Sequence, residues 1–379
     1  MQLDVDAFLK QHWQRKPLLI RDAFPGFEAP IDGDDLAGLA CEPVVPSRLI
    51  LHDPKTDLWT VETGPFADER FASLPETDWT LLVQDVDKMI DPVGALLAHF
   101  SFLPSWRIED IMVSYAAPNG SVGAHVDDYD VFLLQARGQR RWEISTDPGA
   151  DLSFRANVDL KLLKHFVPTE SHVLNPGDML YLPPGVPHHG VAVNGECMTF
   201  SIGLRAPSAG ELMVEFAEFI TERAAGRVRF TDPPLTAGRS PGLIDAASFA
   251  RVQALMDHAS AIDDDDRERW FGQFITRWRM NVEPTARARA IKPAQLIDRL
   301  SAGRVLSRNP FSRMAWRPVA DRRAELYVCG EVYPTTPALA QLLTDQRLLA
   351  LGVLENQITE AQALALLVNL FNAGHFEWT

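Results

Sequence analysis

Two short, distant segments of this 379-residue chain carry side chains that suit one shared site. The first contains His125-Val-Asp127, and the second ends a proline-rich turn at His188, 61 positions after Asp127. Residues i and i+2 of an extended strand point to the same side, so His125 and Asp127 can face one interior together. Two imidazoles and one carboxylate hold a ferrous ion on one face and leave its other positions open. The pattern therefore predicts a second strand folded back over the first.

The sequence between residues 110 and 204 is typical of a β-sandwich or barrel. Short apolar or alternating runs are separated there by Gly, Pro, Asn and Asp, which favour turns. Asn175-Pro-Gly-Asp178 has proline and glycine where a type II turn requires them, and Asp178 is expected to fix that turn rather than bind metal. The strands predicted from these runs are 111–115, 131–134, 141–144, 179–182 and 198–202.

The rest of the chain predicts helices and a second, separate domain. Apolar spacing predicts helices at 5–13, 79–102, 211–222 and 249–278, a strand at 17–21, and loops up to about residue 75. From about residue 290 the order is helix, hairpin at 325–333, helix, helix at 360–371 and short strand, which is winged-helix-like. A chain of this length is expected to form two or three domains.

The net charge of −15 is uneven and bears on the choice of partners. Residues 280–379 hold 11 Lys/Arg and 9 Asp/Glu, so residues 1–279 hold 25 against 42, a balance of −17. An acidic body disfavours direct binding to a nucleic-acid backbone and attracts a basic partner. No apolar run reaches the roughly 20 residues that span a membrane. Three scattered cysteines and an N-terminus unlike a signal peptide predict a cytoplasmic protein.

Two pairs of adjacent residues, His188 with His189 and Arg140 with Arg141, pose a choice, because neighbours on a strand point in opposite directions. Of His188 and His189, we assign His188 as the ligand because it closes the proline-rich turn. An iron site of this kind also needs a cation for the carboxylate of a chelating co-substrate, and arginine engages a carboxylate with two hydrogen bonds. Only one of Arg140 and Arg141 can enter the barrel, and both could instead be surface residues.

Three segments together resemble the JmjC-type cupin oxygenases. They are residues 125–135 (HVDDYDVFLLQ), 138–142 (GQRRW) and 176–188 (PGDMLYLPPGVPH). Within that group the chain most resembles the bacterial ribosomal oxygenases that hydroxylate an arginine of large-subunit ribosomal protein sixteen. Residues 8–17 (FLKQHWQRKP) and 47–49 (SRL) are also similar to that family. The resemblance spans nearly the whole chain and is strongest over 110–204.

This resemblance implies an α+β chain with a double-stranded β-helix (cupin, jelly-roll) catalytic domain at 1–205. A helical dimerisation segment at 206–285 and a winged-helix-like domain at 286–379 would follow. It further implies Fe(II) on His125, Asp127 and His188, 2-oxoglutarate held by Arg140 and Ser114, and dioxygen as the second co-substrate. A basic ribosomal protein would be the substrate, and the chain would be a homodimer. The residues expected near the substrate guanidinium are Tyr115, Asp128 and Tyr129.

Other interpretations stay open from the residues alone. A hydrogen-bonded His–Asp pair could use the first segment without any metal. The same iron site would serve a histidine hydroxylase of a ribosomal protein or a methyl-lysine demethylase, because target choice depends on pocket shape. A non-catalytic cupin could bind a partner, although the ligand set is complete. A winged-helix DNA binder would draw on the arginines at 304, 308, 313, 317, 322 and 323, which no recognition-helix pattern accompanies.

Overall fold

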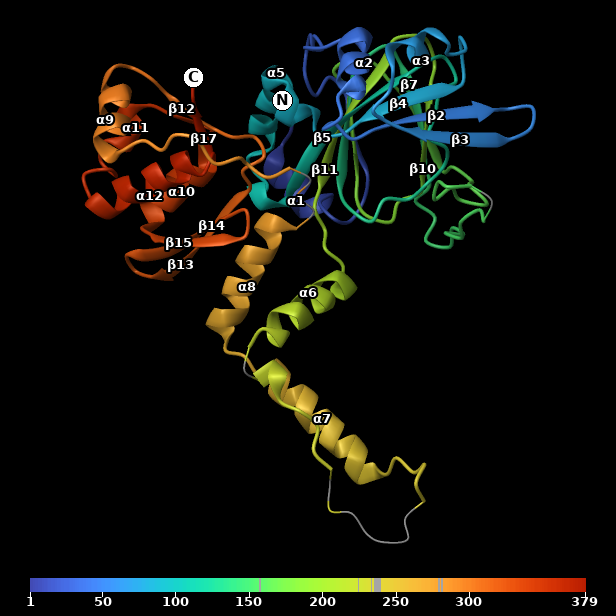
Figure 1. Ribbon diagram of the computed structural model, residues 1–379. Coiled ribbons are helices and arrows are strands. Elements are labelled where there is room, and N and C mark those ends of the chain that lie inside the picture. The colour runs from blue at the N-terminus through green and yellow to red at the C-terminus, as the bar shows by residue number, and fades with distance from the viewer. Residues whose placement is uncertain (157, 224, 233, 235–239, 279, 281) are drawn as a thin grey trace. The chain divides into compact units, whose positions relative to one another are not determined.

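The computed structural model describes residues 1–156, 158–223, 225–232, 234, 240–278, 280 and 282–379. It consists of two compact units, Met1–Ala206 and Pro207–Thr379, called here the barrel unit and the C-terminal unit (Figure 1). The finer, three-part division of the chain stays a prediction. No helix within the described residues is both long and apolar enough to cross a bilayer.

The barrel unit is built mainly from strands. Its helices are α1 (Val5–Gln11), α2 (Gly33–Cys41), α3 (Asp68–Ala72), α4 (Val86–Met89), α5 (Asp91–Gly94), η1 (Ala95–Phe100) and η2 (Ser105–Arg107). Its strands are β1 (Leu18–Ile20), β2 (Ser47–Asp53), β3 (Leu58–Thr63), β4 (Trp79–Val83), β5 (Ile108–Ala116), β6 (Val131–Arg137), β7 (Arg140–Ile144), β8 (Glu170–Leu174), β9 (Met179–Leu182), β10 (His188–Ala192) and β11 (Cys197–Leu204).

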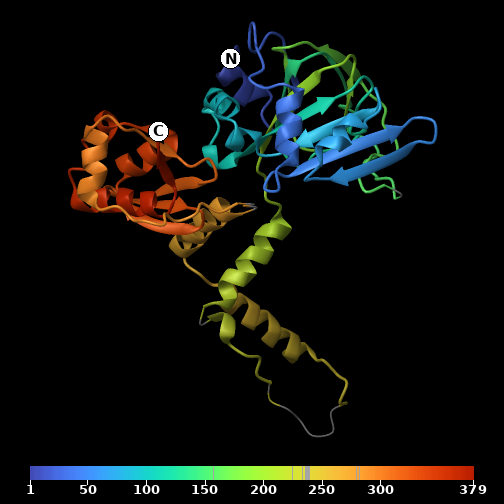
Figure 2. The same cartoon turned by 45° about the horizontal axis from the view of Figure 1, so that its top comes forward.

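Two antiparallel sheets form the barrel. The larger has eight strands in the order β1-β9-β6-β11-β5-β4-β2-β3, and the smaller has three in the order β10-β7-β8. In Figure 2 the strands of the barrel unit are coloured from blue to yellow-green. Apolar side chains of both sheets pack together between them, namely Val131, Leu133, Leu180 and Leu182 with Trp142, Ile144 and Leu174. The five strands predicted between residues 110 and 204 are confirmed as β5, β6, β7, β9 and β11.

The alternation of side chains gives the larger sheet two different faces. Ile111 and Val113 of β5 and Phe132 and Leu134 of β6 enter the main core on the outer face, where helices α1, α2, α4, α5 and η1 also pack. The even-numbered residues of β5 and the odd-numbered residues of β6 face the interior between the sheets. Burial of the outer core on folding supplies much of the stability that holds the inner face in place.

Two predictions for the first hundred residues are wrong. Residues 79–83 form strand β4 rather than the start of a helix, and only the short segments α4, α5 and η1 follow. The stretch up to about residue 75, expected as loops, contains α2, the β2–β3 hairpin and α3. Helix α2 begins with a capping box in which Asp32 and Asp35 accept hydrogen bonds from each other's backbone N–H groups. The predicted helix at 5–13 and strand at 17–21 are confirmed as α1 and β1.

The C-terminal unit combines helices with two small sheets. Its helices are α6 (Ala209–Thr221), η3 (Ala225–Arg227), α7 (Ala246–Ser260), α8 (Asp264–Arg277), α9 (Pro293–Ser301), α10 (Pro337–Asp345), α11 (Leu351–Leu354) and α12 (Ala361–Asn372). Its strands are β12 (Leu306–Arg308), β13 (Met314–Ala320), β14 (Arg323–Val328), β15 (Glu331–Thr335), β16 (Leu348–Leu349) and β17 (Phe376–Trp378). The predicted hairpin and last helix are confirmed as β14–β15 and α12, while the region 249–278 forms two helices, α7 and α8.

Candidate metal centre

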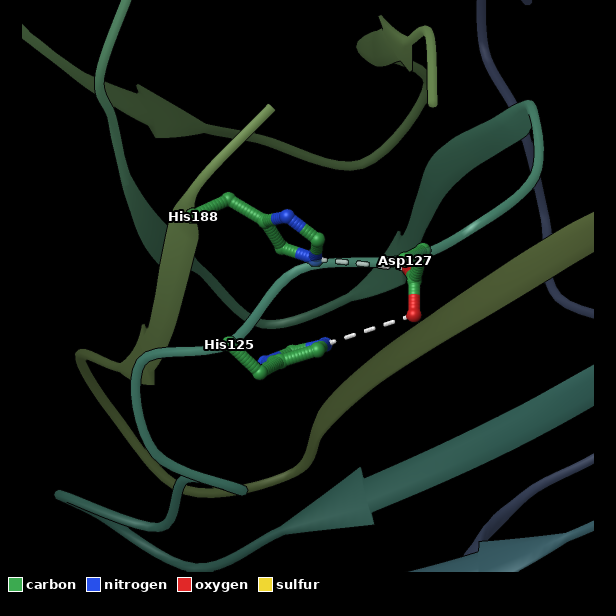
Figure 3. A group of neighbouring side chains, drawn as sticks. All are labelled: His125, Asp127 and His188. Atoms are coloured by element: carbon green, nitrogen blue, oxygen red, sulfur yellow. Dashed lines mark ion pairs between the residues drawn. The ribbon is translucent and has the colours of Figure 1, made fainter. Parts of the chain in front are cut away.

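Three side chains from the two distant segments lie close together inside the barrel unit (Figure 3). His125 and His188 are joined by a reciprocal pair of backbone hydrogen bonds, each N–H donating to the other's carbonyl over 3.0 Å. The Asp127 carboxylate faces the Nε2 atoms of both rings from one side, with Oδ1 3.9 Å from His125 Nε2 and Oδ2 3.6 Å from His188 Nε2. One ligand atom from each residue lies within 4.8 Å of the others. The predicted convergence of both segments is confirmed.

Hydrogen bonds fix the orientation of both imidazole rings. His125 Nδ1 donates to the carbonyl of Gly123 over 3.0 Å, and His188 Nδ1 donates to the carbonyl of Val186 over 2.9 Å. A carbonyl oxygen only accepts, so Nδ1 must carry the proton in each ring, and the lone pair of Nε2 is left facing Asp127. Two Nε2 atoms and one carboxylate form a donor set that suits a divalent iron ion.

His125 and Asp127 face the same interior, as predicted, but the backbone between them is not the extended strand that was expected. His125 makes only an isolated bridge with His188, and the strand begins at Val131, so Asp127 lies in a loop. The carbonyl of Asp127 accepts a hydrogen bond from Gly185 N over 2.9 Å, within the proline-rich turn that precedes His188. Each ligand-bearing segment is thus held by the other's backbone.

Burial makes the centre costly without a cation. It raises the pKa of Asp127, an effect that His125 partly offsets. Burial, followed by the charge of His125, lowers the pKa of His188 well below its usual value. Unpaired charge in a low-dielectric site is unfavourable, and a bound cation favours the deprotonated carboxylate and neutral imidazoles. A bound metal ion therefore suits these three side chains better than a His–Asp cluster without a metal.

A buried arginine lies on the same inner surface as the metal ligands. Strand β7 pairs with β10 so that Arg140, Trp142 and Ile144 are opposite Ala192, Gly190 and His188. Arg140 is 2% exposed, and its guanidinium carbon lies 5.7 Å from the centre of the Trp142 ring. Within the described part of the chain, neither Nε nor Nη2 of Arg140 has a hydrogen-bond partner.

The same strand shows that Arg140, and not its neighbour Arg141, faces the barrel interior. Arg141 faces outward, is exposed, and lies 3.6 Å from Glu143. His189, its counterpart beside His188, also faces Glu143 at 3.6 Å. A buried cation with unsatisfied donors is unfavourable, and an anionic group bound beside Arg140 would remove that cost.

Ser114 also faces the barrel interior, in a row of small polar side chains. It pairs with Thr199 of β11, which pairs in turn with Gln135 of β6. Thr199 Oγ1 donates to Gln135 Oε1 over 3.0 Å, whereas Ser114 Oγ makes only a 3.4 Å bond to the Thr199 carbonyl. Ser114 and Arg140 therefore both belong to the inner surface, one on each sheet.

The residues expected to contact a substrate fall into two groups. Tyr115 lies on the outer face of β5, packed against Trp79 with ring centres 5.8 Å apart, so its predicted place at the mouth is wrong. Asp128 is exposed, and Tyr129 is 38% exposed in the loop after Asp127. Tyr129 also lies near Gly203, since a Cβ atom there would be 4.0 Å from Tyr129 Cε2.

Sequence reasoning missed Asp110, a buried carboxylate on the inner face of β5. It pairs with Gly203, where a Cβ atom would lie 3.6 Å from Asp110 Oδ1. Gly203 also pairs with Val131, the residue that begins β6. Residues 126–130, which precede β6 and include Asp127, are called here the metal-binding loop. Burial raises the pKa of Asp110 to about 7, and the nearby carboxylates of Asp87 and Asp85 add to the rise. A strand assignment from residue 110 with alternating faces would have identified it.

Comparison with known proteins agrees with this geometry. The JmjC domain family matches residues 95–212, and the ROXA-like winged helix family matches residues 254–377. The ribosomal protein uL16 3-hydroxylase of Escherichia coli strain K12 is 35% identical over 382 residues, covering 99% of this chain and 98% of its own.

Solved structures of a relative extend the similarity to the whole fold. The E. coli ribosomal oxygenase YcfD in complex with cobalt and 2-oxoglutarate superposes with a TM-score of 0.84 at 32% identity, over 100% of this chain and 99% of that one. Its complex with cobalt and succinic acid gives the same TM-score, identity and coverage. The present chain therefore belongs to the JmjC-type ribosomal oxygenases that carry a ROXA-like winged helix.

Proposed function

We propose that this chain is an Fe(II)- and 2-oxoglutarate-dependent hydroxylase that acts on an arginine side chain of ribosomal protein uL16. The observation that carries the proposal is the convergence of His125, Asp127 and His188 on one inner surface with the buried guanidinium of Arg140, whose Nε and Nη2 have no partner among the described residues. The named activity of the uL16 hydroxylase relative, which matches this chain over nearly its full length, supports the choice of substrate.

Each inner side chain has a role in this proposal. His125 Nε2, His188 Nε2 and the Asp127 carboxylate would hold the metal on one face, while Arg140 and Ser114 would bind the distal carboxylate of 2-oxoglutarate. With dioxygen, the bound iron supplies an oxidant for an unactivated C–H bond as 2-oxoglutarate becomes succinate and carbon dioxide. Trp142, whose ring centre is 5.8 Å from that of His188, would exclude water between the two sites.

A cationic side chain is the substrate group that the mouth of the barrel suits. Asp110 is a buried carboxylate with a raised pKa, and Tyr129 offers an aromatic ring across the small Gly203. A guanidinium entering this space would restore the charged form of Asp110 and stack on the ring of Tyr129. The acidic balance of residues 1–279 would attract a basic ribosomal protein toward it, and such a substrate would place the enzyme in the cytoplasm.

The helices of the C-terminal unit support a homodimer. Phe249, Val252 and Met256 of α7 are 62%, 44% and 62% exposed at spacings of three and four residues, so they form one apolar stripe. Met213 and Val214 of α6 are 66% and 62% exposed. Apolar surfaces of this kind mark interaction sites, and light scattering after size exclusion would give the mass of the assembly.

Three of the six arginines that suggested a nucleic-acid binder have internal contacts. Arg308 is half-buried and donates to the carbonyls of Leu343 and Thr344 at the end of α10. Arg313 donates to the carbonyl of Trp278, and Arg317 binds carboxylates of α8 and β14. These contacts leave fewer cations for a phosphate backbone.

The test is hydroxylation of a uL16 peptide by the purified protein supplied with Fe(II), 2-oxoglutarate and dioxygen. Expected results are succinate formation and a mass gain of one oxygen atom on an arginine. His125→Ala should abolish both. A mass gain on histidine, or loss of a methyl group from lysine, would redirect the proposal to the alternative targets, and the absence of any peptide-dependent succinate would overturn it.

A further inference from the structure

A second buried carboxylate, Asp130, lies at the far end of the metal-binding loop. It is 0% exposed and has three donors from different parts of the chain. Tyr181 OH donates to its Oδ1 over 2.5 Å, and Arg107 Nη2 and Gln14 Nε2 donate to its Oδ2 over 3.1 Å each. The metal site itself includes none of these four residues.

These donors connect the loop to the N-terminal segment of the chain. The backbone N–H of Gln14 donates to Tyr181 OH over 2.8 Å, so this hydroxyl accepts from one residue and donates to Asp130. Trp13 stacks on Tyr181 with ring centres 5.9 Å apart, and the guanidinium of Arg107 lies 5.6 Å from the Trp13 ring. Residues 13 and 14, just after α1, thus cover the outer side of the loop that carries Asp127.

Backbone hydrogen bonds also hold the loop. Residues 126–130 lie outside any strand. The carbonyl of Asp127 accepts from Gly185, and the carbonyl of Asp130 accepts from Leu204 N over 3.1 Å. Asp127 and Asp130 point to opposite sides, the first toward the two imidazoles and the second toward the outer core. Rotation of the loop would therefore have to break the Asp130 bonds before it could move the Asp127 carboxylate.

An apolar residue would be the cheaper choice at a fully buried position of this kind. A carboxylate instead adds three directional bonds, which fix position rather than maximise stability. Ligand groups need to be held within about half an ångström of their productive geometry, and supporting hydrogen bonds commonly supply that restraint.

We propose that Asp130 is a positioning residue for the metal centre, which it holds in place through Tyr181, Arg107 and Gln14 from the outer side of the barrel. The inference rests on the proposed function, because it assigns a role in binding the metal of that site. It also makes the N-terminal segment, which lies outside the matched JmjC region, a working part of the centre.

The test compares the affinity for Co(II) of wild type and Asp130→Asn, by anaerobic titration followed through the visible absorption of the ion. Removal of the charge and of one acceptor should weaken binding by about 10-fold, the lower end of the effect of groups that orient metal ligands. The matched control is Asp178→Asn. Asp178 is also a buried carboxylate, 6% exposed, that accepts from an arginine and two backbone N–H groups, but it fixes the turn before β9.

Asp178→Asn should bind Co(II) as wild type does, even where both variants melt at similarly lowered temperatures. Tyr181→Phe keeps the ring packing, removes one bond to Asp130, and should weaken Co(II) binding by about 3-fold. It serves in place of Asp130→Asn if that variant does not fold. Unchanged Co(II) affinity in folded Asp130→Asn or Tyr181→Phe would overturn the inference, as would an equal loss in Asp178→Asn. Failure of the wild type to bind Co(II) would instead count against the proposed function.

Discussion

Two arginines, one in each unit, differ in how their charge is satisfied. Arg317 in the C-terminal unit donates to Glu325, Glu268 and Asp265 over 2.5–3.0 Å, and so joins α8 to the β13–β14 hairpin. Arg140 in the barrel unit is more deeply buried, yet within the described residues its Nε and Nη2 have no partner. The first arrangement is complete as folded, whereas in the proposed function the second would be completed by the carboxylate of 2-oxoglutarate. The difference separates a structural charge from a binding charge.

The largest expected effect is on the affinity for 2-oxoglutarate. Arg140→Met should raise the KM for 2-oxoglutarate by about 100-fold, because truncation of one partner of a buried charge pair costs about 3 kcal/mol. The apo protein should be as stable as wild type or slightly more so, since the variant removes a buried charge without a partner. Steady-state succinate assays and thermal melts measure the two effects. A normal KM would make Arg140 another structural charge.

Arg317→Met should have the opposite profile. It leaves the carboxylate of Glu325, which also binds Arg269 over 2.5 Å, without its second cation. Unfolding of the C-terminal unit should become easier by about 3 kcal/mol, while the KM for 2-oxoglutarate stays unchanged. Denaturant melts and the same succinate assay provide the readouts, and a raised KM with normal stability would contradict the comparison.

Ligand-induced stabilisation should also separate the two arginines. At 100 times its dissociation constant, 2-oxoglutarate with Co(II) should stabilise the wild type by about 2.7 kcal/mol. Arg317→Met should keep this gain and Arg140→Met should lose it at the same concentration. Anaerobic scanning calorimetry with and without 2-oxoglutarate measures the shift, and its survival in Arg140→Met would place the carboxylate elsewhere.

The smallest expected effect concerns Asp110, a buried acid whose carboxylate accepts a hydrogen bond from Asp85 N. Burial raises its pKa to about 7, above the unfolded value of about 3.9. Protonation therefore stabilises the fold at low pH, and this contribution is lost as pH rises toward 7. Asp110→Asn mimics the protonated form, so its stability relative to wild type should grow by about 2 kcal/mol from about pH 4 to about pH 7. A pH-independent difference between their melts would show that Asp110 stays ionised.

The sequence predicts the centre better than the parts around it, for physical reasons. His125, Asp127 and His188 can be recognised in the sequence because few functions other than metal binding require two imidazoles and a carboxylate in this pattern. Strand β4 was mistaken for a helix because it is buried on both faces, so its apolar run has no alternation. Asp110 was missed because the role proposed for it depends on Gly203, which lies opposite it only after β5 and β11 pair.

The choice between Arg140 and Arg141 depends on strand register, which the sequence alone does not give. Alternation says that one enters the barrel, but which one depends on the register between β7 and β10. Asp130 is a similar case, because its three donors lie 116, 51 and 23 positions away along the chain. Local patterns establish which chemistry is possible, and only tertiary pairing decides which side chain performs it.

The backbone pairing between His125 and His188 has a practical consequence. Main-chain bonds between His125 and His188 fix the distance between the two ligand segments without using either imidazole ring. A variant that lacks one of the two imidazoles should therefore keep its fold. It should still bind its substrate but not hydroxylate it. Such a variant could serve as bait for recovering that target from cell extract.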